Sequence, residues 1–334
     1  MAIDPRGSPG PVLLVGGAAE NWTGDARFHE YSTAADPVGA RTIPSVPVRR
    51  FPAETHRRVG TGLVPLDLSA ELGVPYPASS PALLAAFVVL APGAALTTTG
   101  EGTSELYYCL EGSGRSGFRC AVPGTGPSEG DIAWAAGDFV VLPAGCTIEH
   151  RADPGGSALL YRVTDAPLLR YLGATPGEAR FAATRYDGRR AAELLAEVER
   201  DPDAGRRSRV SILLGNAATP QTLTATHTLW AMLGVLPAGQ AQRPHRHQSA
   251  AVDLITACRP GCYSLLGTEL GADGSIIDPV RVDWEAAGAF VTPPGLWHSH
   301  HNESGHPAYL VPVQDAGLHT YLRTLDIRFA PAGA

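Results

Sequence analysis

The sequence predicts an all-β protein built from two tandem barrels, with a few helices at their periphery. Three observations lead to this prediction: short apolar runs between Gly/Pro turns, a composition that can fill two cores, and an internal repeat. The chain has 334 residues, of which 44% are hydrophobic and 18% charged. This length allows two ordinary domains, and this balance of residues is not that of a disordered chain.

The apolar runs divide the chain into segments. The first 50 residues are rich in Pro, Gly and Ala without a sustained period, and we expect an arm there with one short strand over residues 12–15. From position 51 onward, short apolar runs alternate with turns, which is typical of a β-sandwich or barrel. We expect a first barrel over residues 51–175 and a second over residues 210–334.

Residues 176–209 separate the two barrels and include the clearest helix of the chain. Within them, residues 188–200 (GRRAAELLAEVER) repeat apolar side chains at helical spacing. The following Asp-Pro-Asp-Ala-Gly stops this pattern, and we interpret it as a linker. A second, shorter helix is expected over residues 316–325, outside the second barrel.

The two halves of the chain repeat one another. Residues 132–145 (IAWAAGDFVVLPAG) match residues 282–295 (VDWEAAGAFVTPPG), 150 positions later. At the same offset, DAPL and YL within residues 165–172 match DAGL and YL within residues 315–322. A third match, LAPG to LPAG, precedes both in the same order. The chain is therefore predicted to be a duplicated β-domain.

Charge and cysteine content narrow the possible partners. A net charge of -7 argues against nucleic acid and anionic membranes, which bind basic surfaces. Five cysteines without regular spacing do not indicate a disulfide framework, and we expect ordinary thiols in a reducing cytosol. The sequence has no pattern typical of a secretory signal or a membrane span. A cytoplasmic protein is expected.

Three histidines of the second half are placed as metal ligands would be. His245 and His247 are two residues apart in an extended stretch, so their side chains project from the same face. His298 follows a Pro-Pro-Gly turn on a neighbouring predicted strand. Three imidazoles can hold one transition metal and leave positions open for substrate or dioxygen. The alternative is that these histidines only bond to the backbone.

The motifs around these histidines resemble those of cupins, which are double-stranded β-helix (jelly-roll) barrels. Gly239 is followed after five residues by His-x-His, and the later motif reads Pro-x-Gly-x-x-His-x-x-x-Asn from Pro293 to Asn302. The resemblance covers about 250 residues. It implies two cupin barrels, and in the second of them a metal site formed by His245, His247 and His298.

Within cupins, the sequence is similar to the bicupin gentisate, salicylate and 1-hydroxy-2-naphthoate dioxygenases. Residues 244–247 (PHRH) and 297–302 (WHSHHN) carry this likeness, and the glutamate slot of the motif falls on Ala251 or Val252. The resemblance implies Fe(II) as cofactor, although Zn, Ni or Mn could also bind such a site. It also implies dioxygen and an aromatic small molecule as reactants, and a homodimer or homotetramer.

Two further residues are candidates for contact with the substrate. His300 lies two residues after His298 and points to the same side, where the family places a substrate-contacting histidine, so it is a candidate hydrogen-bonding or acid/base group. Asp253 stands where the family has a carboxylate-binding arginine. Facing inward, Asp253 would repel a carboxylate and prefer an amine or hydroxyl; alternatively it points away or caps a strand. Arg259 or Arg281 could replace the missing arginine.

The first half keeps the cupin skeleton without the ligands. Counting along the motif puts Thr99, Glu101 and Ile148 in its histidine slots. A hydroxyl, a carboxylate and an alkyl group do not make a three-imidazole site. We therefore expect the first barrel to serve packing and dimerisation. This departs from the family, which usually carries its working iron in the first cupin.

Taken together, the residues and the resemblance predict a non-haem Fe(II) dioxygenase that acts on a hydroxylated or amino-substituted aromatic compound, with ring cleavage as the implied reaction. The alternative is a non-oxidative metal-dependent cupin, such as an isomerase, cyclase or decarboxylase, or a small-molecule-binding bicupin.

Overall fold

A computed structural model describes residues 22–124, 126–201 and 209–331 of the chain. The chain divides into two units, residues 1–43 and residues 44–334. Among the described residues of the first unit, helix α1 (Tyr31–Ala34) is the regular element. The strand expected over residues 12–15 lies outside the described residues.

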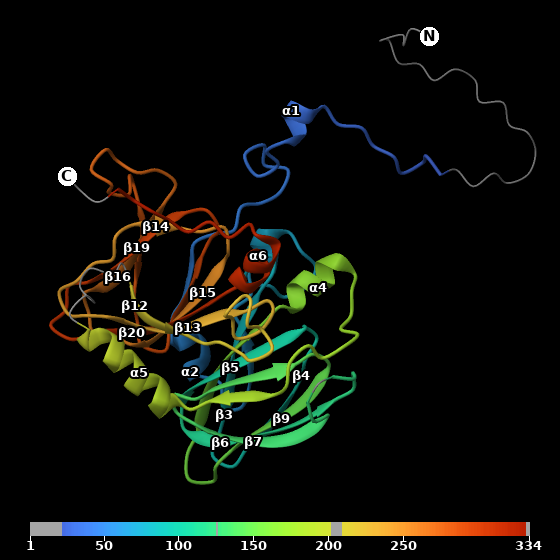
Figure 1. Ribbon diagram of the computed structural model, residues 1–334, viewed down its shortest axis with the longest axis vertical. Helices are drawn as coiled ribbons and strands as arrows, with labels where there is room; N and C mark the ends of the chain where they lie inside the picture. Colours follow the sequence, from blue (N-terminus) through green and yellow to red (C-terminus); the bar gives the residue numbers. More distant parts are fainter. Residues whose placement is uncertain (1–21, 125, 202–208, 332–334) are drawn as a thin grey trace, which may run out of the picture. The chain divides into compact units, whose positions relative to one another are not determined.

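The first barrel is made of two antiparallel sheets (Figure 1). The six-stranded sheet has the order β11-β8-β5-β10-β3-β2, and the four-stranded sheet has the order β4-β9-β6-β7. The bounds of these strands are β2 (Gly62–Pro65), β3 (Leu84–Leu90), β4 (Ala95–Thr99), β5 (Ser104–Glu111), β6 (Ser113–Cys120), β7 (Glu129–Ala135), β8 (Phe139–Pro143), β9 (Cys146–Ala152), β10 (Ala158–Thr164) and β11 (Thr184–Tyr186).

The second barrel repeats this plan with the orders β1-β18-β15-β20-β13-β12 and β17-β16-β19-β14-β21. Strand β1 precedes the first barrel in the sequence and yet pairs with β18 of the second barrel. The bounds are β1 (Arg49–Phe51), β12 (Val210–Leu213), β13 (Trp230–Leu236), β14 (His245–Arg246), β15 (Ala251–Ala257), β16 (Cys262–Gly267), β17 (Val280–Asp283), β18 (Ala289–Thr292), β19 (Trp297–Asn302), β20 (Ala308–Gln314) and β21 (Arg328–Phe329).

Among the described residues, the alternation of side chains along the strands creates three separate apolar cores. On β15, Val252 and Leu254 join a core shared by the six-stranded sheets of both barrels, whereas Ile255 joins a core inside the second barrel. On β5, Leu106 joins the shared core and Tyr107 faces the interior of the first barrel. Because side chains alternate with period two, each six-stranded sheet has one face toward its own barrel interior and one toward the other barrel.

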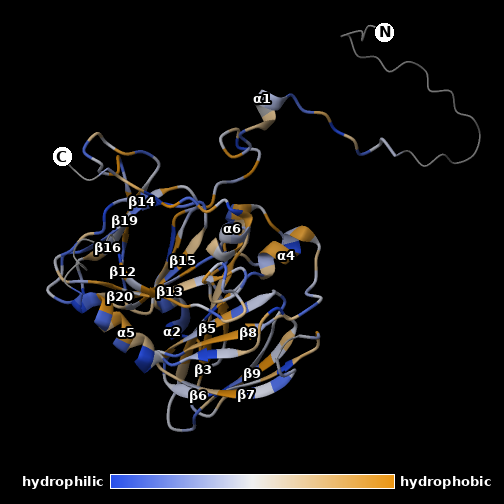
Figure 2. Cartoon of the chain, viewed as in Figure 1, coloured by the Kyte–Doolittle hydropathy of each residue, from blue (hydrophilic) through white to orange (hydrophobic). Residues whose placement is uncertain are grey.

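The helices within residues 44–334 lie outside the sheets. Helix α5 spans Gly188–Arg200, which confirms the predicted helix, and Figure 2 shows hydrophilic and hydrophobic stripes along it. The side chain of Asp187 caps its first turn by accepting from the Arg190 N–H at 2.9 Å. The other helices are α2 (Glu54–Arg57), α3 (Ser69–Leu72), α4 (Ala166–Leu172) and α6 (Ala316–Leu322). None of the helices in the described ranges has the length and apolarity that crossing a membrane requires.

The expectation that all five cysteines are thiols is wrong for one pair. Cys120 on β6 and Cys146 on β9 form a disulfide. The two residues are 26 positions apart in sequence, but the antiparallel register places them directly opposite each other. Cys109, Cys258 and Cys262 are free thiols. Sequence spacing could not reveal this pair, because the strand register brings it together.

Candidate metal centre

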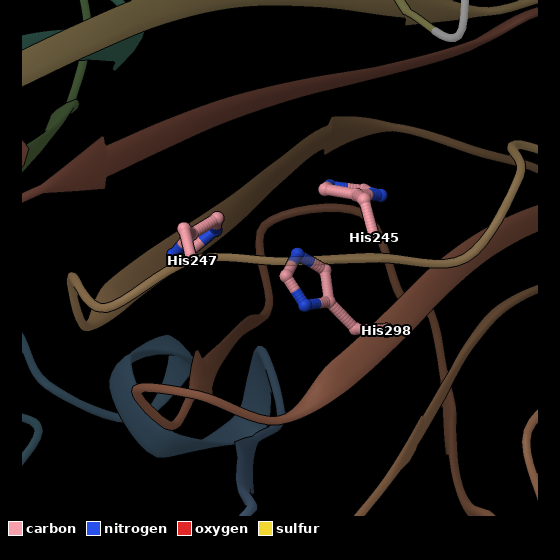
Figure 3. A group of neighbouring side chains, drawn as sticks. All are labelled: His245, His247 and His298. Atoms are coloured by element: carbon pink, nitrogen blue, oxygen red, sulfur yellow. The ribbon is translucent and has the colours of Figure 1, made fainter. Parts of the chain in front are cut away.

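Three histidines converge inside the mouth of the second barrel. His245 lies on β14 directly opposite His298 on β19, and His247 follows β14 by one residue. One ligand nitrogen from each of the three lies within 4.8 Å of the other two, and all three residues are buried. Figure 3 shows the rings turned toward one another. Gly295 holds the turn before His298, with a φ of 79° that disfavours other residues.

Backbone carbonyls fix the protonation of all three rings. The Nδ1 atoms of His245, His247 and His298 lie 3.2, 2.9 and 3.0 Å from the carbonyl oxygens of Arg243, Ser249 and Leu296. A carbonyl oxygen only accepts, so each Nδ1 carries the proton and each Nε2 keeps a free lone pair. Histidine ligands in proteins are commonly oriented in this way.

Burial keeps these imidazoles neutral. It lowers the pKa of His245 and His298 well below the ordinary value and that of His247 to about 4. The neighbouring rings and Arg209 add to the shift of His245, because each would be a like charge. Neutral imidazole is the form that binds a cation. The donor set therefore fits a divalent transition metal held by His245, His247 and His298, as the spacing predicts.

A cavity of about 120 Å³ lies beside two of the three histidines. Arg209, the residue before β12, reaches into its wall. Its lining is His245, His247, Arg209, Trp230, Met232, Gln314, Ile327 and Phe329. The buried indole N–H of Trp230 has no partner in the described protein. The cavity thus offers a guanidinium and an unpartnered donor close to the predicted ligands.

His300 points into the barrel next to the three histidines without joining them as a ligand. Its ring centroid lies 5.9 Å from that of His298. Its Nδ1 lies 2.8 Å from the Ser264 hydroxyl, which also accepts from the Trp284 indole N–H at 2.8 Å. Its Nε2 lies 3.2 Å from a guanidinium nitrogen of Arg209. Since arginine only donates, His300 accepts at Nε2 and holds Arg209 in place.

Asp253 faces the interior of the second barrel but lies outside the histidine group. The side chain is 2% exposed, and its Oδ2 accepts from the Thr292 hydroxyl at 2.7 Å. Burial raises the pKa of its carboxyl to about 6, with Thr292 and Arg209 opposing the shift. Asp253 does not line the cavity beside the histidines, and the side-chain contact of its carboxylate is with Thr292 on the neighbouring strand β18.

The first barrel replaces the metal ligands with other groups. The register places Thr98 opposite Ile148, just as His245 is opposite His298. The slot assigned by counting to Thr99 therefore belongs to Thr98, which is buried, whereas Thr99 is exposed. Glu101 is also exposed and pairs with Arg170 at 2.7 Å. A shift of one residue moves a side chain to the other face of a strand.

A buried ion pair lies inside the first barrel. Arg162 donates two hydrogen bonds to the Glu105 carboxylate, at 2.6 and 2.9 Å, and both side chains are buried. His150 contacts the Thr98 hydroxyl at 3.2 Å and the Ser116 hydroxyl at 2.8 Å. Among the described residues, the group of side chains close enough together to hold a metal ion is the histidine trio of the second barrel, and the first barrel contains none. Glu105 has its counter-charge in Arg162 instead.

Two other histidines near the ligand strand and the two candidate arginines lie elsewhere. His301 stacks on Tyr263 with centroids 4.8 Å apart, and His306 is exposed. Arg259 is exposed, and Arg281 pairs with Asp283 at 2.9 Å. Neither of these two arginines lines the cavity. Arg209, which does, was missed from the sequence because it sits among other arginines in the linker.

No family model matches the sequence, and no curated protein matches it. Solved structures do match this chain. A mutant of salicylate 1,2-dioxygenase from Pseudoaminobacter salicylatoxidans, in complex with gentisate, matches with a TM-score of 0.67 and 14% identity, over 91% of this chain and 92% of that one. A gentisate adduct of the same enzyme matches with a TM-score of 0.67 and 15% identity, over 91% of both chains.

A mutant oxalate decarboxylase from Bacillus subtilis is also similar, with a TM-score of 0.52 and 14% identity, over 79% of this chain and 76% of that one. At such identities the likeness concerns the fold. The two-barrel architecture, the coverage of about nine-tenths of the chain by the first match, and the motif positions of the ligand histidines agree. The chain has the fold of a double-domain cupin.

Proposed function

We propose that this chain is a metal-dependent enzyme that binds Fe(II) in its second barrel and oxidises a hydroxylated or amino-substituted aromatic compound with dioxygen. The observation that supports this most is the group of three buried imidazoles with free Nε2 atoms beside a cavity. Bound there, a ferrous ion would supply open coordination positions and the redox chemistry that dioxygen activation needs.

Arg209 and Trp230 support a substrate that carries an acidic group. A guanidinium is a planar fork that suits a carboxylate, and His300 holds this one at the cavity wall. The free indole N–H of Trp230 adds a second donor. Asp253 faces the same interior, but Thr292 holds its carboxylate, and Arg209 lies close enough to lower its pKa. The charges around the cavity therefore suit hydroxybenzoates as well as aminophenols.

The size of the cavity favours a second candidate function. Ligand sites usually measure about 300–1,000 Å³, whereas this cavity has about 120 Å³. A small organic anion fits such a volume directly. The alternative is therefore a non-oxidative metal-dependent reaction, such as decarboxylation of a small acid, and the fold shared with an oxalate decarboxylase is compatible with it.

Metal analysis combined with oxygen uptake separates the two candidates. The protein would be loaded with Fe(II) under argon and offered salicylate, gentisate and 2-aminophenol, with release of carbon dioxide from oxalate measured in parallel. Oxygen consumption with an aromatic compound supports the dioxygenase, and oxygen-independent decarboxylation supports the alternative. Arg209→Ala should abolish turnover of acids, whereas Arg281→Ala, a change of an exposed arginine outside the cavity, should not. Absence of bound metal would refute both.

A further inference from the structure

The sheet that carries the ligand histidines has a strand that its counterpart does not. In the second barrel β14 lies between β19 and β21, whereas in the first barrel the corresponding β4 ends the sheet and pairs with β9. Strand β21 belongs to residues 325–331, which we call the closing segment. Within the described parts of the chain, the closing segment is thus an addition to the barrel with the metal site.

A two-pair ladder and a backbone hydrogen bond hold the closing segment on β14, the strand that carries His245. Phe329 lies opposite His245 in a ladder of two residue pairs. The N–H of Ala330 donates to the carbonyl of Pro244 at 2.8 Å, directly before that histidine. Since few hydrogen bonds hold such an edge, it can separate locally while the rest of the barrel stays folded.

Two side chains of the closing segment form part of the cavity wall. Ile327 and Phe329 both line the cavity, and they are 39% and 40% exposed. The Phe329 ring stacks on His245 with centroids 5.7 Å apart. Arg243 covers the same ring at 5.1 Å. These side chains therefore lie between the predicted metal ligands and solvent.

In the first barrel, the equivalent segment packs on a different part of the barrel. At the repeat offset of 150, the closing segment corresponds to residues 175–181, which follow α4 as the closing segment follows α6. There Ala179 forms a parallel bridge with Gly124, and its N–H donates to Pro123 at 2.7 Å. This segment thus packs on the loop after β6, and β4 stays uncovered by it.

We propose that the closing segment is the gate of the metal pocket and that Ile327 and Phe329 determine the size of the molecule it accepts. The cavity of about 120 Å³ is too small to be an ordinary ligand site. Separation of β21 from β14 would open it toward solvent. The statement on substrate size rests on the proposed function, whereas the statement on the gate requires only that a metal binds.

A disulfide engineered between β14 and β21, which can be formed and reduced, tests whether the closing segment acts as a gate. Arg246 and Arg328 are directly opposite in the ladder, as Cys120 and Cys146 are in their own. The double variant Arg246→Cys/Arg328→Cys can therefore form a disulfide that locks β21 onto β14. In the Co(II)-loaded protein, fading of the visible absorption measures how fast a chelator removes the ion. We expect the oxidised variant to lose cobalt at least tenfold more slowly than its reduced form.

The controls separate the effect of the engineered disulfide from the effects of the substitutions and of the reductant. Each single cysteine variant and the wild-type protein receive the same reductant, because the native disulfide is also reduced. None of these should change its rate of cobalt loss with oxidation state. Equal rates for the oxidised and reduced double variant would overturn the gate. Should the double variant not fold, Phe329→Ala must speed cobalt loss, and Ile277→Ala, a change of an apolar side chain 44% exposed outside the cavity, must not.

A pair of acids tests the size limit. Salicylate and 1-hydroxy-2-naphthoate are titrated against the Co(II) spectrum. We expect the wild type to prefer the single ring, and Ile327→Ala or Phe329→Ala to reduce this preference at least fivefold, with Ile277→Ala unchanged. An unaltered preference would overturn the size limit. If neither acid perturbs the wild-type spectrum, the substrate class proposed above fails, while the chelator experiment still decides on the gate.

Discussion

Each barrel contains a serine hydroxyl that a tryptophan and a histidine both contact, an arrangement we call the relay. The two barrels differ in the group that the second ring nitrogen of the relay histidine contacts. In the first barrel, Trp134 and His150 both contact the Ser116 hydroxyl at 2.8 Å. In the second, Trp284 and His300 contact the Ser264 hydroxyl at the same distances. This likeness extends the sequence repeat to side-chain contacts inside the barrels.

The difference begins at the far nitrogen of each relay histidine. The Nε2 of His150 meets the Thr98 hydroxyl, whereas the Nε2 of His300 meets the cation of Arg209. The first barrel satisfies its buried charges internally through Glu105 and Arg162. The second has neutral ligands whose lone pairs face one another. The first interior therefore pairs these buried charges within the protein, whereas the second presents a donor set that fits a cation and, under the proposed function, an acid beside it.

Removal of one ligand should have the largest effect. His298→Ala leaves two imidazoles, and metal affinity should fall by far more than the roughly ten- to hundredfold that loss of an outer-shell partner costs. His150→Ala, in the first barrel, should keep about one ion per chain. Isothermal titration with Zn(II) and metal analysis after gel filtration measure both. Equal retention of metal in the two variants would contradict the assignment.

Disruption of the ion pair in the first barrel should cost stability without loss of metal. Glu105→Gln leaves the buried guanidinium of Arg162 without its counter-charge, which costs about 3–5 kcal/mol of the free energy of unfolding. The double variant Glu105→Leu/Arg162→Met removes both charges and should recover most of that loss. Urea unfolding followed by fluorescence gives the values. A fall in metal content in Glu105→Gln would show that the barrels are not independent.

The serine of each relay gives a matched pair. Ser116→Ala and Ser264→Ala each leave a tryptophan N–H without its acceptor, and each should cost roughly 1–3 kcal/mol of stability. Ser264→Ala should in addition weaken binding of acids, because His300 then no longer orients Arg209. Titrations of the Co(II)-loaded proteins with salicylate compare the two. The account is contradicted if both variants bind the acid as the wild type does.

The last comparison concerns the aspartates before α4 and α6. Asp165 accepts from two backbone N–H groups and the Thr228 hydroxyl, whereas Asp315 accepts from the Ala250 N–H at 2.9 Å. Burial raises the pKa of Asp315 to about 7. Ionisation is therefore less favourable in the folded than in the unfolded chain, and stability falls as pH rises from about 4 toward 7.

The Asp315→Asn variant should therefore gain stability relative to the wild type as pH rises across this range, since asparagine keeps the acceptor and removes the charge. Asp165→Asn should lose stability because the carboxylate oxygens accept several hydrogen bonds that an amide NH₂ group cannot accept. Thermal unfolding at pH 4.5, 6 and 8 compares the variants. A constant difference between Asp315→Asn and the wild type over this range would show that the carboxyl does not titrate there.

Much of this structure follows from local patterns in the sequence. The repeat predicts two similar barrels, and helical spacing predicts α5 with its observed bounds. The i, i+2 spacing of His245 and His247 predicts a shared face, because side chains of a strand alternate. The same period predicts that His300 points inward with His298. Each of these inferences needs only spacing within one element.

The parts that escaped prediction depend on register and on distant segments. Counting along the motif missed Thr98 by one residue, and one residue reverses the face of a strand. Cys120 and Cys146 meet only through the pairing of β6 with β9. Arg209 and Phe329 reach the pocket from segments outside the motifs. No local period marks such residues, since folding of the whole barrel places them.

Anomalous diffraction from crystals grown with Fe(II) tests the central claim most directly. The account predicts one strong peak in the second barrel, within bonding distance of the Nε2 atoms of His245, His247 and His298. It predicts no peak beside Glu105 or His150 in the first barrel. An ion lodged in the first barrel, or three rings turned apart around no ion at all, would contradict it.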